Sequence, residues 1–232
     1  MNNYLSISIA SILAFSVPGM AKAQTFTIQG NANIFSAGLS TPVAPGGNGG
    51  GILPVSFSLS PGQNVFQFSA SGSVTENTLG GVYHGPDGRP GVGNIVYAYG
   101  GLSGFITDQV APLAAVFLTD AAPGGTPPPT LDFSSGGLGL DFTTLAPAIG
   151  QVFFIGDGQT SGGTIQTFYA PAGATRLFLG VPDSVNGESL PGGYDDNAGS
   201  FNVTVTTVPE PAIPALSMMG AALFFALRRR KS

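Results

Sequence analysis

The chain has 232 residues, of which only 8% are charged, and it contains 36 glycines and 19 prolines. It has no cysteine, which excludes disulfides and thiolate metal sites. Between residues 24 and 207 two arginines stand against eleven acidic residues, a formal charge of −9, so the sequence argues against nucleic acid as a partner.

The N-terminal segment predicts a signal peptide at residues 1–23. An apolar stretch over 5–17 is followed by a Pro-Gly break and by the pattern Ala21-Lys22-Ala23. Small residues at the first and third of these positions are typical of the site that signal peptidase cleaves. We therefore expect cleavage between Ala23 and Gln24, with Gln24 as the mature N-terminus.

The pattern over 24–207 indicates one domain of short strands joined by turns, because alternating apolar residues recur between Gly- and Pro-rich stretches. We expect strands near 26–28, 55–59, 65–74, 95–99, 113–119, 151–155, 164–169, 175–181 and 200–206, and loops at 42–51, 80–93, 123–129 and 190–193. No useful helical period appears outside the two ends. The predicted fold class is all-β, an antiparallel β-sandwich.

An acidic, amide-rich loop near the end of this domain is the clearest candidate for a site. It joins the predicted strand 175–181 to the strand 200–206 and contains Asp183 and the run Tyr194-Asp195-Asp196-Asn197. Calcium takes about 6 to 8 hard oxygen ligands from carboxylates, amides and backbone carbonyls. An irregular loop between strands can bring such groups together.

This passage, together with 68–74, 85–88 and 113–118, resembles the bacterial calcium-dependent galactose-binding lectin family over roughly 65–206. The shared order is an apolar strand, an Asp, a Tyr, a pair of adjacent residues that are usually both Asn in the family and are Asp196-Asn197 here, and a strand that begins Gly-Ser-Phe. The resemblance implies a jelly-roll sandwich that binds galactose-type sugars through calcium. The ligands that it implies are Asp183, the Gly193 carbonyl, Asp196 and Asn197, with a further backbone carbonyl near Glu76.

Two alternatives remain open at this point. Asp and Asn in such a loop also form Asx turns without any metal, so a purely structural biofilm or exopolysaccharide-matrix component is one alternative. A polysaccharide-degrading enzyme is a weaker one, because the acidic residues show no spacing specific to glycoside cleavage. The single histidine, His84, is expected to be a loop residue. We therefore predict no catalytic residue and no enzymatic activity.

The C-terminal segment combines three features in order: the motif Val208-Pro209-Glu210-Pro211, an uncharged stretch over 212–227 and a basic tail over 228–232. This arrangement closely resembles the PEP-CTERM sorting signal, which implies processing by an exosortase. A helix over 212–227, at about 1.5 Å per residue, reaches the low end of what spans a hydrocarbon core of about 30 Å. The basic tail should remain cytoplasmic.

The sequence thus predicts an exported protein with three parts: a signal peptide at 1–23, a β-sandwich at 24–207 and a sorting signal at 208–232. The C-terminal helix would anchor it in the membrane until processing, after which it belongs to the cell surface or the extracellular matrix. Its expected partners are signal peptidase, an exosortase, and exopolysaccharide or galactose-type sugars.

Overall fold

Strands dominate the computed structural model, which describes residues 21–77 and 79–209, and they pair into three sheets within the unit Ala21–Val208. The all-β class is therefore confirmed. The only helical segments in these ranges are two 3-10 turns, η1 Ile34–Ser36 and η2 Val185–Gly187, and no described helix could cross a membrane. Most of the predicted signal peptide and the predicted helix over 212–227 lie outside the described residues.

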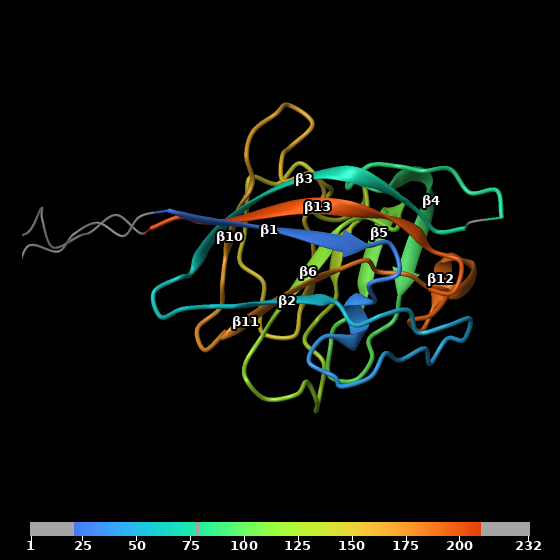
Figure 1. Cartoon of the computed structure of the whole chain (residues 1–232), viewed down its shortest axis with the longest axis horizontal. Helices are drawn as coiled ribbons and strands as arrows, with labels where there is room; N and C mark the ends of the chain where they lie inside the picture. The colour runs from blue at the N-terminus through green and yellow to red at the C-terminus, as the bar shows by residue number, and fades with distance from the viewer. Residues whose placement is uncertain (1–20, 78, 210–232) are drawn as a thin grey trace, which may run out of the picture. The chain divides into compact units, whose positions relative to one another are not determined.

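The largest sheet has five strands, and three long ones form its body (Figure 1). Its order is β1 (Lys22–Gln29), β13 (Ala198–Thr207), β3 (Val65–Thr75), β10 (Thr167–Tyr169) and β8 (Thr144–Leu145). The first four strands pair antiparallel and β8 pairs parallel with β10. The first and last long strands of the unit are thus neighbours in one sheet.

Two four-stranded sheets complete the unit. One has the order β2 (Val55–Ser58), β11 (Arg176–Gly180), β6 (Ala114–Leu118) and β9 (Val152–Phe154). The other has the order β12 (Glu188–Ser189), β4 (Arg89–Val96), β5 (Phe105–Val110) and β7 (Leu131–Phe133). Every residue of β6 is buried, as expected of an inner strand covered on both faces.

Phenylalanine rings connect the layers through the core. Phe66 of β3 contacts Phe117 of β6 with ring centroids 5.6 Å apart, and Phe117 stacks on Phe153 of β9 at 5.3 Å. Phe153 in turn contacts Phe168 of β10 at 5.5 Å, which closes the path back to the first sheet. Each such pair contributes about 1 kcal/mol beyond the burial of its apolar area. The aromatic content therefore holds the sheets together without disulfides.

Two of the sequence expectations were wrong at the third sheet. The loop expected over 80–93 contains the first part of β4, and Tyr97 to Tyr99 follow the end of that strand. The pairing of β4 with β5 shifts between Pro90 and Asn94, and Gly91 has a positive φ of 90°. This bulge accommodates the proline and glycines that resembled a turn in the sequence.

Strand β5 was missed because its burial does not follow hydrophobicity. Thr107 is buried while Ile106 is only partly covered, so the usual apolar-in, polar-out alternation is inverted at this pair. The buried threonine hydroxyl accepts a hydrogen bond from the backbone N–H of Gln109 at 3.2 Å. A local bond of this kind lets a polar residue occupy an inner position.

Candidate functional site

Most of the predicted ligands come together around one cavity of about 480 Å³. Asp183, Gly193 and Asp196 line it from the segment between β11 and β13, and Glu76 lines it from the end of β3. Asn197 is buried and its side chain reaches the Asp183 carboxyl. Residues that are separate in the sequence thus meet at the end of the unit where β3 stops and β13 begins.

Tyr194 fixes the chain on either side of Pro182 and so positions Asp183. The tyrosine side chain is 1% exposed, and its hydroxyl accepts a hydrogen bond from the Asp183 N–H at 3.0 Å. The same hydroxyl donates to the Val181 carbonyl at 2.9 Å. One buried phenol therefore bonds two backbone groups where β11 has ended. The Asp183 N–H would otherwise lie unpaired in the interior, whereas the Val181 carbonyl also accepts a hydrogen bond from the Ile34 N–H at 3.3 Å.

Asp183 itself is almost completely buried, at 6% exposure. Its Oδ1 accepts a hydrogen bond from the Ser184 N–H at 2.7 Å. Burial raises the pKa of Asp183 to about 8; the Asn197 side chain and the Ser184 N–H oppose this, and the charges of Asp196 and Glu76 reinforce it. Among the described residues, no Lys, Arg or His forms an ion pair with Asp183.

The loop over 46–51 supports the acidic loop from outside. Gly193 donates its N–H to the Gly47 carbonyl at 3.0 Å, and Asp195 donates its own to the Asn48 carbonyl at 3.2 Å. Gly193 has a positive φ of 85°, and a Cβ placed on it would lie 3.6 Å from the Asp183 carboxyl carbon. A side chain at this position would therefore be strained by the backbone conformation, and its Cβ would contact the carboxylate at ordinary van der Waals distance.

Asn197 holds an incompletely satisfied amide beside the cavity. Its Nδ2 donates to the Gly30 carbonyl at 3.2 Å, which ties the start of β13 to the end of β1. Its Oδ1 is buried and has no hydrogen-bond partner in the described structure. A buried amide oxygen without a partner is costly, so it marks a position where a donor or a cation would be stabilising.

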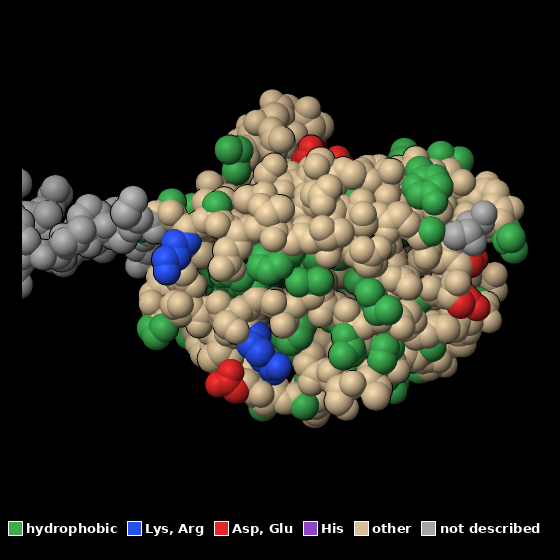
Figure 2. All heavy atoms as spheres, viewed as in Figure 1, with side chains coloured by type: hydrophobic (Ala, Val, Ile, Leu, Met, Phe, Trp, Pro, Cys, Tyr) green, Lys and Arg blue, Asp and Glu red, His purple; other side chains and the backbone are tan. Residues whose placement is uncertain are grey.

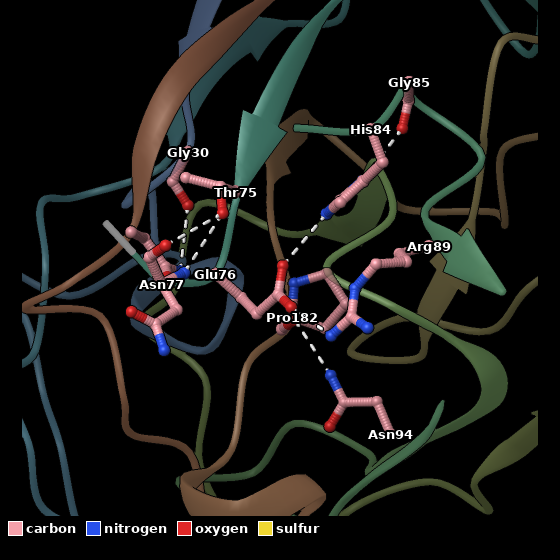
Figure 3. A network of polar contacts seen from close by, with 10 residues as sticks. Gly30, Thr75, Glu76, Asn77, His84, Gly85, Arg89, Asn94 and Pro182 are labelled. Carbon is pink, nitrogen blue, oxygen red and sulfur yellow. Dashed lines mark hydrogen bonds and ion pairs between the residues drawn. The ribbon is translucent and has the colours of Figure 1, made fainter. Parts of the chain in front are cut away.

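Glu76 has a fully partnered carboxylate (Figure 3). Its Oε1 pairs with Arg89 Nη2, and its Oε2 lies 3.3 Å from His84 Nε2. Burial raises the pKa of Glu76, but a backbone hydrogen bond, Arg89 and His84 outweigh it and leave the pKa below its usual value. Because both carboxylate oxygens of Glu76 already have partners, Glu76 could bind a metal ion only through its backbone carbonyl, as the lectin resemblance implied.

Arg89, Asn94 and Ser184 are among the lining residues that were not anticipated from the sequence. Asn94 donates from Nδ2 to the Pro182 carbonyl at 3.2 Å, and Ser184 donates its hydroxyl to Asn94 Oδ1 at 2.8 Å. These two bonds brace the acidic loop against β4, while Arg89 pairs with Glu76 at the end of β3. The sequence pointed to Arg89 only through its rarity, because it is one of two arginines between residues 24 and 207.

The cavity carries more negative than positive charge. Its lining includes four acidic side chains and one arginine. Burial raises the pKa of Asp196 as well, and the charge of Asp195 adds to this effect. Even so, no three His, Asp or Glu side chains of the described residues converge closely enough to form a metal cluster. Any cation would therefore need amide and carbonyl oxygens in addition to carboxylates.

The two predicted processing sites lie at the opposite end of the large sheet from the cavity. Ala23 and Gln24 belong to β1 and pair with Thr206 and Val205 of β13. Val208 follows β13 directly and donates its N–H to the Val65 carbonyl at 2.8 Å. Pro209 is the last described residue, and Glu210 and Pro211 lie outside the described ranges. Cleavage at Ala23 remains a prediction.

Comparison with known proteins identifies the C-terminal segment. Residues 207–231 match the PEP-CTERM protein-sorting motif. No match to the chain was found among the curated proteins. The chain therefore carries a confirmed sorting motif of the kind that exosortases process, and this motif implies export and C-terminal sorting to the cell surface.

Proposed function

We propose that this exported surface protein is a non-enzymatic, carbohydrate-associated binding protein whose site is a calcium ion held at the cavity beside Asp183. One observation carries the proposal: the Asp183 carboxyl is almost completely buried and has no cationic partner among the described residues. An isolated buried carboxylate is strongly unfavourable, so it either takes up a proton or gains a cation.

The donors around Asp183 suit a hard divalent cation. Asp183 and Asp196 would supply carboxylate oxygens, Asn197 its unpartnered Oδ1, and Gly193 and Glu76 their backbone carbonyls. This mixture of carboxylate, amide and carbonyl oxygens is what calcium prefers, and it needs no cluster of three acids. The negative charge of the lining would also draw cations toward the cavity.

The residues around the cavity suit binding of a ligand rather than catalysis. When bound, calcium supplies positive charge and open coordination positions that sugar hydroxyls can fill. The protein groups hold the ion and shape the cavity, and Glu76 is already paired with Arg89 and His84. The same loop carries the resemblance to the calcium-dependent galactose-binding lectins, so galactose-type sugars or exopolysaccharide are the proposed ligands. The same resemblance is the basis for proposing that the strands follow a jelly-roll order.

Thermal unfolding of the exported, processed protein in EDTA and then in millimolar calcium tests this proposal. A ligand that binds only the folded state at 100 times its dissociation constant adds about 2.7 kcal/mol, so calcium should raise the midpoint. An Asp183→Ala and Asp196→Ala double variant should lose the response. Galactose should raise the midpoint further only when calcium is present.

A matched control removes two acidic side chains that do not line the cavity. The Asp108→Ala and Asp120→Ala variant removes the same number of carboxyl groups and should keep the full calcium response. If calcium does not change the unfolding midpoint of the parent protein, the acidic loop is only a turn and holds no metal. The structural matrix component would then become the better description.

A further inference from the structure

Asparagine is concentrated around the cavity beside Asp183. Four of the residues that line the cavity are asparagines, namely Asn48, Asn77, Asn94 and Asn186. The lining has 14 of the 184 residues from 24 to 207, and this segment contains nine asparagines, so an even spread would place about one of them there. A fifth, Asn197, reaches the Asp183 carboxyl with its side chain. Amide side chains are therefore as numerous in the cavity wall as acidic ones.

The fold accounts for three of these five asparagines. Asn94 bonds the acidic loop through both ends of its amide. The Oδ1 of Asn77 accepts a hydrogen bond from the Leu79 N–H at 2.8 Å, and Asn197 donates to the Gly30 carbonyl at 3.2 Å. Each of these bonds fixes a loop or the end of a strand, so local structure explains why an amide stands at these three positions.

Asn48 and Asn186 have no such role in the fold. Within residues 21–77 and 79–209 neither side-chain amide makes a hydrogen bond, and both residues are exposed. Both have a positive φ, of 52° and 59°, which asparagine tolerates but glycine adopts without strain. The neighbours Gly47 and Gly49 also have positive φ, yet of the loop 46–51 only Asn48 lines the cavity. The turns would form with glycine, so the amides themselves lack a structural reason.

The lining of the cavity suits a small neutral ligand that is rich in hydroxyl groups. Among the described residues that line it, Val110 and Val185 are the only large apolar ones and none is aromatic, so an apolar ligand would gain little. Figure 2 shows acidic side chains at the end of the unit near β12, and four acids in the lining would disfavour an anion. An amide both donates and accepts, as a sugar hydroxyl does. The volume of about 480 Å³ is that of a small-molecule site.

We infer that Asn48 and Asn186 are specificity residues, whose amides hydrogen-bond the hydroxyls of a small neutral sugar that also contacts the proposed calcium. The inference rests on the proposed function and deepens it, because it separates the residues that select the ligand from those that hold the ion. Asn48 lies outside the stretch that resembles the lectins, so that resemblance does not assign it. Neither residue is a proposed metal ligand, so the ion should stay in place when the amides are removed.

An Asn48→Gly and Asn186→Gly variant of the exported, processed protein tests the inference, because glycine keeps the positive φ and removes only the amides. Thermal unfolding compares it with the parent in EDTA and in calcium, and calorimetry then measures galactose binding in calcium. The midpoint in EDTA and its rise in calcium should equal those of the parent. Galactose should bind about fivefold more weakly for each hydrogen bond lost. Galacturonate, which has the same ring with a carboxylate, should bind the parent more weakly than galactose does.

Asn202→Thr is the matched control, since it removes an exposed amide from β13, away from the cavity, and should behave as the parent does throughout. Unchanged galactose binding in the glycine variant, with its calcium response intact, overturns this inference and leaves the proposed function standing. A lower midpoint of that variant in EDTA assigns the amides to the fold and also overturns it, as does tighter binding of galacturonate. A parent without a calcium response contradicts the proposed function, and the inference with it.

Discussion

Glu76 and Asp183 line the same cavity, yet their carboxylates have opposite surroundings. Glu76 pairs with Arg89 and His84, which keep its pKa below the usual value. Asp183 is more deeply buried and has only Ser184 and Asn197 to oppose the burial, which raises its pKa to about 8. The difference teaches that one acid is complete within the fold, while the other needs a proton or a cation from outside.

The largest expected effect is a pH dependence that arises from Asp183. Its pKa is about 8 in the folded state against about 3.9 when unfolded, so only the folded chain holds the proton between these values. In EDTA the free energy of unfolding should therefore fall as pH rises from about 4 to about 8, by about 1.4 kcal/mol per pH unit from this group. Urea denaturation across the range measures the slope.

Substitution Asp183→Asn should remove that contribution, and excess calcium should do so in the parent. Asp108→Asn is the matched control, because a hydrogen bond from Ser135 lowers the pKa of exposed Asp108 and moves its titration below the window. An unchanged slope in Asp183→Asn would mean that the buried carboxyl is not the group that titrates.

Breaking the ion pair between Glu76 and Arg89 should have the next largest effect on the free energy of unfolding. Arg89→Met leaves Glu76 buried without its main partner, and we expect a loss of about 3 kcal/mol, the low end for a buried ion pair, because the Arg89 side chain is 32% exposed. Arg176→Met is the control; its guanidinium binds backbone carbonyls and lies over Phe178, so about 1 kcal/mol should be lost. Equal losses in urea denaturation would contradict the contrast.

A smaller effect should follow from Tyr194→Phe. Removing the hydroxyl leaves the Asp183 N–H buried without a partner and the Val181 carbonyl with only the Ile34 N–H, which should lower the free energy of unfolding by about 2 kcal/mol. The same change should weaken the calcium response, because it frees the backbone of Asp183. Tyr169→Phe, at a 43% exposed position, should change stability by about 0.5 kcal/mol or less. Unaltered unfolding of Tyr194→Phe would show that the hydroxyl does not position the acid.

The long strands could be predicted because one face of each is buried, so apolar residues recur at every second position, as Phe26 and Ile28 do in β1 and Phe201 and Val203 in β13. Three of the short strands could not, although β9 and β10, with three residues each, lie within the expected strands 151–155 and 164–169. β7, β8 and β12 have two or three residues each and exist through parallel pairing with β5, β10 and β4. Local sequence carries too few residues to reveal such strands, because their pairing depends on chain packed elsewhere.

The site divides in the same way. Asp183, Asp196 and Gly193 lie close in the sequence, and a resemblance in that short passage was enough to group them. Glu76 was placed there only as a backbone carbonyl, and its pairing with Arg89 joins the end of β3 to the start of β4. Tertiary contacts of this kind give no periodic signal, so the partner that distinguishes the two acids emerged only from the fold.

Strand β13 separates the sorting motif, where the chain is processed, from the cavity proposed to bind the ligand. Its ten residues, at about 3.3 Å each, run about 30 Å from the cavity end at Ala198 to Thr207, directly before the sorting motif (Figure 1). A chain attached through its processed C-terminus would be held at one pole. The cavity, at the other pole, would open away from the attachment and toward the surrounding medium.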